Sequence, residues 1–151
     1  MGRKVAIGIG NYLRRDDGIG PKVIEQISLR ELNKNFEIED IATDGLRLFK
    51  YFHQAVEKII IIDSAFMGQK PGTVMVFSPD QVLSRKTFQH ISLHEGDLLN
   101  LINLARKLCL PIPEIKIIAI EPAQVNEGIM LSDCIQSKVD EVINHIIHEL
   151  S

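Results

Sequence analysis

The stretch from Lys4 to Ile27 constrains the fold more than any other part of the chain. It opens with an apolar run from Val5 to Ile9, which is too short for a helix and long enough for a buried strand. Gly8 and Gly10 then allow a tight turn where a side chain would clash. Further on, Pro21 suits the first turn of a helix, where its missing N–H costs nothing. The stretch therefore predicts a strand, a polar loop and a helix in direct succession.

Apolar patterns in the rest of the chain alternate between strand and helix. Strands are expected at 36–41, 59–62, 73–77 and 115–120, and helices at 21–32, 46–56, 94–110 and 132–150. The run IIII at 59–62 is strongly β-branched and is expected to form the central strand. This alternation predicts an α/β sandwich with a mostly parallel sheet. The link into 73–77 is too short for a crossover helix, so this strand is expected to run antiparallel to the strand at 59–62, at an edge of the sheet.

Length and composition narrow the class of protein. A chain of 151 residues fits a single domain spanning 1–151. Its 17 basic and 20 acidic residues, a formal net charge of -3, argue against nucleic acid or a membrane surface as a partner. The sequence has neither a signal-peptide pattern nor an apolar run long enough for a membrane span. We therefore expect a cytoplasmic protein, with Cys109 and Cys134 as buried free thiols.

Three polar residues are candidates for chemistry because of their predicted positions. Asp17 follows the first strand, Asp63 ends the third, and His94 precedes the third long helix. The carboxyl ends of the first and third strands flank the usual ligand crevice of such a sheet. Two carboxylates and an imidazole suit a divalent transition metal, and a carboxylate can also activate water. The ordinary structural alternative makes Asp17 a helix-start acid, Asp63 a turn former and His94 a polar residue near a helix start.

Other patterns in the chain give weaker candidates. Asp16, next to Asp17, is expected to cap the helix or to pair with Arg14, Arg15 or solvent. His90 and His94 have the spacing of a two-histidine metal site, but the residues between them carry no clear helix signal. The dinucleotide fingerprint GxGxxG requires a third glycine where this chain has Leu13, which argues against a small nucleotide-binding protein.

The motifs GIGNYLRRDDGIG, IIIIDSAFMGQKPGTV and ISLHE together resemble the hydrogenase maturation proteases, and the resemblance covers nearly the whole chain. It implies a three-layer α/β/α sandwich on a five-stranded mixed sheet with one antiparallel strand. It also implies an endopeptidase that removes the C-terminal extension of the large-subunit precursor of a nickel–iron hydrogenase. In that family, the positions of Asp17, Asp63 and His94 contact nickel, which is carried by the substrate and is not a permanent cofactor. We expect a cytoplasmic monomer whose partner is this precursor.

A second hypothesis from a different class uses the same three residues. The chain would then be a non-catalytic module that binds the nickel-bearing subunit, or a metal chaperone. Only a protease shortens a nickel-loaded precursor, so incubation of the two proteins separates the hypotheses.

One segment departs from the family pattern. After the second strand the family has D-x-G-T-x-G, whereas this chain has Asp40, Ala42, Thr43 and Gly45 at the four defined positions. Alanine resists backbone shapes that glycine adopts freely. The substitution is therefore expected to affect the local loop and the fit of the substrate beside the site.

Overall fold

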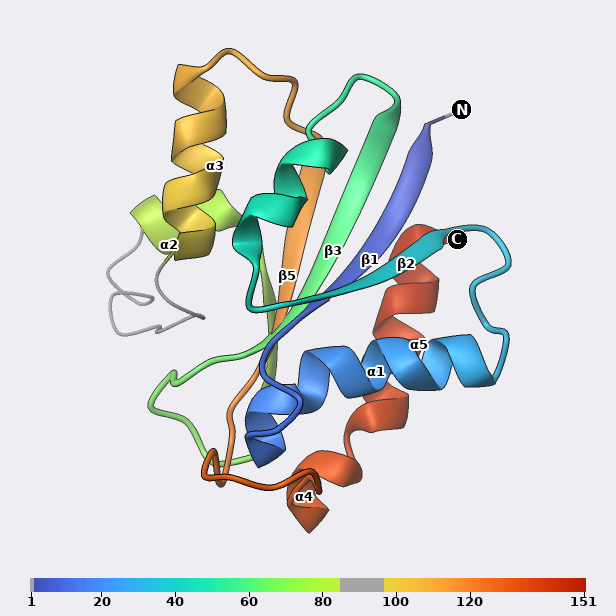
Figure 1. The fold of residues 1–151 in the computed structure, drawn as a ribbon, viewed down its shortest axis with the longest axis vertical. Helices are drawn as coiled ribbons and strands as arrows, with labels where there is room; N and C mark the ends of the chain where they lie inside the picture. The colour runs from blue at the N-terminus through green and yellow to red at the C-terminus, as the bar shows by residue number, and fades with distance from the viewer. Residues whose placement is uncertain (1, 85–96) are drawn as a thin grey trace.

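The computed structural model describes residues 2–84 and 97–151, and Figure 1 shows the arrangement of its strands and helices. The strands are β1 (Arg3–Ile9), β2 (Glu37–Ala42), β3 (Val56–Ser64), β4 (Val74–Phe77) and β5 (Glu114–Ile120). The α-helices are α1 (Ile19–Leu29), α2 (Pro79–Ser84), α3 (Asp97–Lys107), α4 (Asp133–Gln136) and α5 (Val139–Leu150). Two 3-10 helices, η1 (Arg15–Gly18) and η2 (Gly45–Tyr51), follow β1 and β2.

The five strands form one mixed sheet in the order β2-β1-β3-β5-β4. Parallel pairing joins β2, β1, β3 and β5, and β4 pairs antiparallel with β5 at the edge. The predicted central strand is confirmed as β3, which lies between β1 and β5. The chain moves from β1 to β2 on one side and returns to β3 on the other, so the order reverses between β1 and β3. Ligands bind beyond the carboxyl ends of the strands at such a reversal.

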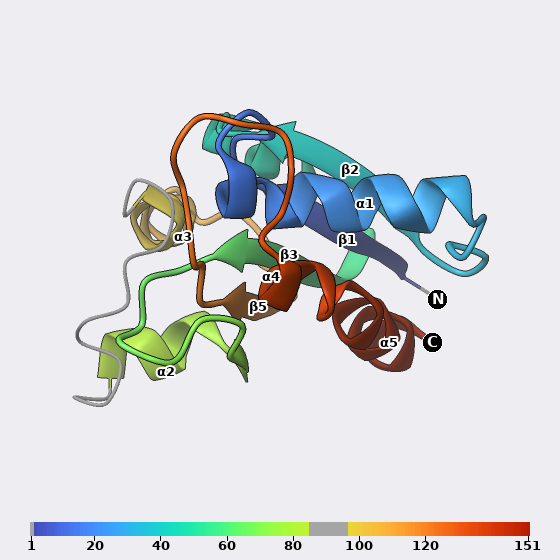
Figure 2. The same cartoon turned by 90° about the horizontal axis from the view of Figure 1, so that it is seen from below.

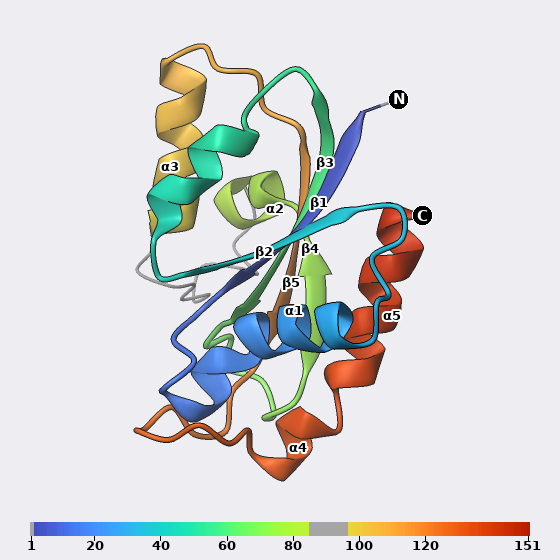
Figure 3. The ribbon, with the colours of Figure 1, turned by 45° about the vertical axis from the view of Figure 1, so that its right-hand side comes forward.

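Each face of the sheet is covered by its own apolar core, which gives the expected three-layer sandwich (Figure 3). Alternate residues of β3 point to opposite faces. Ile59 and Ile61 pack on the side of η2 and α3, while Ile60 and Ile62 pack on the side of α1 and α5. In the described residues, no helix combines the length and the apolar composition that a membrane span requires.

Two expected helices differ from the structure. In the stretch 46–56, the short 3-10 helix η2 ends at Tyr51, and Val56 is buried, pairs with Arg3 and begins β3. Asp44 occupies the N-cap position of η2 and makes no side-chain capping hydrogen bond. The long last helix is interrupted between Gln136 and Val139, which separates α4 from α5.

The prediction that both cysteines are buried is also wrong. Cys109 and Cys134 are free thiols, and both are exposed. Cys109 lies beyond the end of α3 in the left-handed backbone region, with a φ of 57°. Cys134 lies on the four-residue helix α4, whose only buried residue is Ile135. The apolar pattern continues past the end of α3 and across the short helix α4, so it indicates a burial of both thiols that the structure does not have.

Candidate functional site at the carboxyl ends of the strands

Buried polar side chains gather at one end of the sheet. Among the described residues, the buried polar or charged ones are Asp16 (0% exposed), Asp63 (0%), Ser64 (5%) and Glu121 (5%). Asp63 and Ser64 end β3, Glu121 follows β5 directly, and Asp16 lies in the turn that follows β1. Burial of a charged group is costly unless hydrogen bonds compensate for the lost water, so this clustering marks the end of the sheet where function is expected.

A tight turn brings Asp17 to this end. Gly10 has a φ of 144°, and a Cβ added there would lie 2.0 Å from the carbonyl oxygen of Asp17. A Cβ on Gly20 would lie 2.5 Å from the carbonyl oxygens of both Ile9 and Ile62. Only glycine fits these two positions, because any side chain would push the turn and the start of α1 away from β1 and β3.

Among the described residues, Asn11 and Ser64 donate hydrogen bonds that orient the carboxylate of Asp17. The backbone N–H of Asn11 donates to Oδ2 at 3.0 Å. The hydroxyl of Ser64 donates to Oδ1 at 3.0 Å. The second bond connects the turn after β1 to the last residue of β3, which directly follows Asp63. The structure therefore brings Asp17 to the strand end that carries Asp63, as the sequence predicts.

The side chains of Asp63 and Ser64 face opposite sides of the sheet. By the alternation along β3, Asp63 faces the side of η2 and α3 with Ile61 and Ala65, and Ser64 faces the side of α1 with Ile62. Asp63 is fully buried. Its position at the reversal point of the sheet agrees with the predicted position of the crevice.

The third predicted residue, His94, lies outside the described residues, which resume at Asp97 at the start of α3. Its predicted approach to Asp17 and Asp63 stays a prediction. Within residues 2–84 and 97–151, no group of three or more His, Cys, Asp or Glu side chains is arranged to hold a metal ion.

Asp16 differs from the sequence-based expectation. It neither pairs with Arg14 or Arg15 nor faces solvent, because it is fully buried and accepts hydrogen bonds from the loop between β5 and α4. The two arginines instead donate from Nε to the carbonyl oxygens of Val125 and Met130 in the same loop. The residues near Asp16 in the sequence give no indication that it contacts this loop.

Sequence reasoning missed Glu121. Its Oε1 accepts hydrogen bonds from the backbone N–H groups of Met67 (2.7 Å) and Gln69 (3.1 Å). It therefore holds the loop that follows Asp63 against the end of β5. A usable signal was present, because Glu121 follows the apolar run of β5 directly, as Asp63 follows that of β3.

Ala42 adopts the backbone shape that the sequence comparison put in question. Its φ is 52°, in the left-handed region that favours glycine. Its carbonyl accepts a hydrogen bond from the N–H of Gly10 at 2.8 Å, and its own N–H donates to Asp40 Oδ1 at 2.8 Å. The chain thus keeps the turn expected of the family's glycine while bearing the strain of a Cβ.

An apolar groove opens beside the end of β1, between η2 and α3. Its volume is about 360 Å³, and its lining includes Ile9, Thr43, Gly45, Leu46, Leu101 and Leu104. Leu46 and Leu104 are 66% and 45% exposed, so the groove is open to solvent along its rim. It lies on the same side of the sheet as Asp63.

Fold and site together define an α/β protein with an acidic site at the carboxyl ends of its parallel strands. Residues 21–149 match the family model described as hydrogenase maturation protease. A hydrogenase expression/formation protein HupD of Rhodobacter capsulatus is 27% identical over 150 residues, covering 98% of this chain and 71% of the relative. The HupD of Rhizobium leguminosarum bv. viciae is 31% identical over 104 residues, covering 68% of this chain and 51% of that protein.

Solved structures show the same fold. The maturation protease HybD of Thermococcus kodakarensis superposes with a TM-score of 0.79 at 25% identity, covering 99% of both chains. The hydrogenase maturating endopeptidase HybD of E. coli gives 0.80 at 20% identity, covering 98% of this chain and 91% of that one. The chain belongs to the hydrogenase maturation protease family, a family of endopeptidases.

Proposed function

We propose that this protein cleaves the C-terminal extension from the nickel-loaded precursor of a hydrogenase large subunit. Family membership supports a protease that acts in hydrogenase maturation. The observation that carries the assignment to this site is the hydrogen bond from Ser64 to Asp17, which brings the turn carboxylate to the strand end bearing Asp63. Nickel enters this proposal as part of the substrate.

In the proposed site, Asp17, Asp63 and His94 contact the substrate's nickel. Carboxylate and imidazole groups are suitable ligands for nickel. Hydrogen bonds from Asn11 and Ser64 fix the orientation of Asp17, as supporting residues do for metal-contacting groups. An oriented carboxylate is also placed to accept a proton from an attacking water. A set of three groups from this chain would leave other positions around nickel for ligands of the precursor.

The groove between η2 and α3 is the proposed binding site for the polypeptide of the precursor. Its lining includes Ile9, the last residue of β1, and it lies on the same face of the sheet as Asp63, so we place the precursor's chain there on its way to the site. Its apolar lining suits aliphatic side chains. Leu46→Glu places a charge on the rim, where Leu46 is 66% exposed, and should raise the KM for the precursor several-fold with little change in kcat.

The decisive experiment incubates the purified protein with nickel-loaded and with nickel-free precursor. Mass spectrometry of the products should show a shortened large subunit and a released C-terminal peptide only with the loaded form. Binding of the loaded precursor without release of a peptide would instead support a non-catalytic module. Equal cleavage of both forms would overturn the role of nickel while leaving the protease activity in place.

A cytoplasmic location and a monomeric state complete the proposal. The free thiols of Cys109 and Cys134 agree with a reducing compartment, and a single-domain chain of 151 residues is compatible with a monomer. Sedimentation at a mass near 17.0 kDa would agree with a monomer, whereas a mass near twice that value would contradict it.

A further inference from the structure

The neighbouring carboxylates Asp16 and Asp17 have different environments. Asp16 is fully buried, whereas Asp17 is partly exposed. Asp16 Oδ2 accepts hydrogen bonds from the N–H groups of Ala123 (2.9 Å) and Gln124 (2.8 Å) and from the Ser132 hydroxyl (2.7 Å). Its Oδ1 accepts one from the N–H of Ser132 at 2.7 Å. Four hydrogen bonds compensate this carboxylate without a cation taking part in any of them.

All four donors belong to the loop between β5 and α4 or to its end. Backbone hydrogen bonds continue the contact: Asp16 N–H donates to Gln124 O at 3.0 Å, and Arg15 N–H donates to Gly128 O at 2.8 Å. Figure 2 shows this loop arching around η1 and the start of α1. Lys22, on α1, donates to the carbonyl of Ile129. Burial lowers the pKa of Lys22, and the nearby carboxylates of Glu25 and Asp16 offset only part of that effect.

Two further features make the turn dependent on these contacts. Arg15 has a φ of 47°, a left-handed conformation that is strained for a residue with a side chain. Such strain persists only where surrounding contacts over-determine the backbone. Ser132, the residue at the start of α4, makes no capping hydrogen bond to its own helix, and its hydroxyl donates to Asp16.

We propose that Asp16 is a positioning residue for cleavage: by tying its turn to the loop 121–132, it sets the position of the Asp17 carboxylate at the end of β3. This inference rests on the proposed function and deepens it. Asp16 and Asp17 are consecutive residues of the four-residue helix η1, so fixing one restricts the other. An asparagine at position 16 would present an N–H₂ group to at least one of the four donors, and the turn would have to shift.

The test compares Asp16→Asn with Ser132→Ala and with the wild-type protein. Cleavage of the nickel-loaded precursor gives kcat and KM. Hydrogen exchange of the Asn11 amide, which donates to Asp17, reports the position of that carboxylate independently of activity. Amides of β3 such as Ile60 and Ile61 report the integrity of the sheet.

For Asp16→Asn we expect a 10- to 100-fold fall in kcat, the range typical of residues that orient metal-contacting groups, with KM within about two-fold. The Asn11 amide should exchange at least ten-fold faster while the β3 amides keep their protection. Ser132→Ala removes the hydroxyl donor and leaves the three N–H groups, so both effects should have the same sign and be smaller. This second variant also tests the proposal if Asp16→Asn does not fold.

Cleavage by Asp16→Asn within two-fold of wild type, with an unchanged Asn11 amide, would overturn the proposal. Equal loss of protection at Asn11 and throughout β3 would also overturn it, because Asp16 would then act only through overall stability. If the wild-type protein leaves the nickel-loaded precursor uncut, the proposed function fails. The Asn11 measurement still decides whether Asp16 positions Asp17.

Discussion

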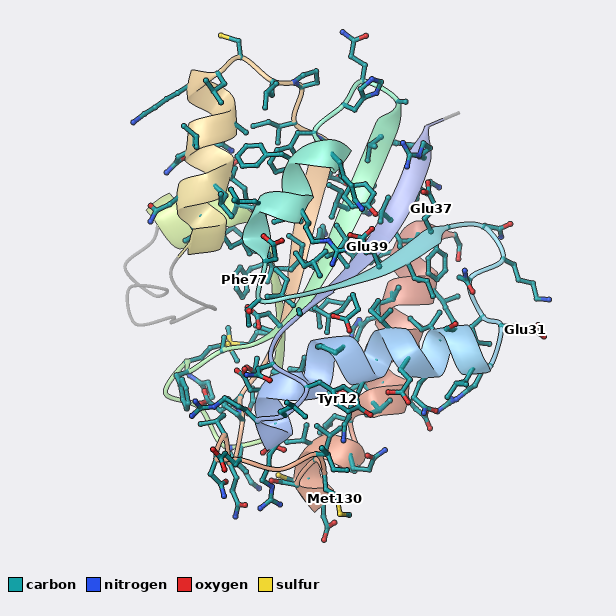
Figure 4. The ribbon with its side chains drawn as sticks, viewed as in Figure 1. Tyr12, Glu31, Glu37, Glu39, Phe77 and Met130 are labelled. Atoms are coloured by element: carbon teal, nitrogen blue, oxygen red, sulfur yellow. The ribbon has the colours of Figure 1, made fainter. Side chains whose placement is uncertain are left out.

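The two ends of the central sheet hold their charged side chains in opposite ways. At the amino-terminal end, acids meet cations: Glu37 accepts hydrogen bonds from Arg3 at 2.7 and 2.8 Å, and Lys58 lies 2.6 Å from Glu149 and 3.1 Å from Glu114. Glu37 lies toward the upper end of Figure 4, near the N-terminus, and Met130 lies at the opposite end, beside α4. Charges at the amino-terminal end therefore neutralise one another.

At the carboxyl-terminal end, buried acids accept hydrogen bonds from backbone N–H groups and serine hydroxyls. Asp16 accepts three from N–H groups and one from Ser132, and Glu121 accepts two from N–H groups. Such donors satisfy a carboxylate without cancelling its charge. The difference teaches that one end of the sheet is built for stability, and that the other keeps negative charge in fixed positions, which suits contact with a cation.

The largest expected effect is the loss of cleavage when one of the three site residues is replaced, compared with replacement of an acid elsewhere. Asp17→Asn, Asp63→Asn and His94→Ala should each reduce cleavage of the nickel-loaded precursor at least 100-fold, because each removes a group proposed to contact nickel or move a proton. Asp17→Asn and His94→Ala should also fold normally, with circular dichroism and melting temperature close to wild type.

Asp140→Asn is the matched control for the site acids. Its carboxylate is 73% exposed and pairs with Arg30 on the surface. This variant should cleave at the wild-type rate. Normal processing by both Asp17→Asn and His94→Ala would contradict the site assignment.

A second prediction concerns the N–H groups that Glu121 satisfies. Glu121→Ala leaves the N–H groups of Met67 and Gln69 without their acceptor and should lower the free energy of unfolding by about 2–3 kcal/mol. Because one oxygen accepts both bonds, Glu121→Gln can keep them and should cost less than about 1 kcal/mol. Urea unfolding of both variants measures the difference. Equal losses would mean that the charge stabilises this end, contrary to the comparison.

The amino-terminal end should respond to pH through its ion pairs. The hydrogen bond from Lys58 lowers the pKa of Glu149, so this stabilisation is present above the unfolded pKa of about 4.3 and is lost as pH falls through the folded value. Burial alone would lower the pKa of Lys58, but hydrogen bonds to Glu149 and Glu114 outweigh it and raise the pKa. The Lys58 contribution is therefore present below about 10.4 and is lost as pH rises through the folded value.

Glu149→Gln should thus cost about 1 kcal/mol at neutral pH. The difference from wild type should stay level between about pH 5 and 10 and shrink outside that window. Denaturant titrations at several pH values provide the measurement. A cost that grows on acidification would contradict the assigned direction of the Glu149 shift.

The smallest predicted effect is a gain in stability. Ala42→Gly relieves the left-handed strain at the end of β2 and should raise the free energy of unfolding by about 0.5–1 kcal/mol. Ala42→Val is the opposing control, because a β-branched residue tolerates this conformation less well. A loss of stability in Ala42→Gly would show that the turn is not strained in solution.

Residues with a local cause were predictable from sequence. The apolar run at 59–62 gave the central strand, and the glycines after β1 gave the tight turn that carries Asp17. The location of Asp63 at the carboxyl end of the sheet was predictable because this residue comes directly after the apolar run of a buried strand. A short link also predicted the antiparallel direction and the edge position of β4, but β4 pairs with β5 and not with the expected neighbour β3.

Features that depend on distant contacts were not predictable in the same way. The hydrogen bonds of Asp16 join residues more than 100 positions apart, and nothing near Asp16 in the sequence identifies its partners. The break between α4 and α5 has the same character, since apolar spacing continues across it. Ser132 resembles a helix cap by residue type, yet its hydroxyl serves Asp16.

The contact of Asp17 with Ser64 has a mechanical consequence. Ser64 and Asp63 are consecutive residues of a strand flanked on both sides, and the hydrogen bond from Ser64 attaches the turn of Asp17 to the same strand. The hydrogen bond therefore restricts how far the turn of Asp17 can move from the strand that bears Asp63. Under the proposed function, this restriction would let the site select an ion by fit, without remodelling around it.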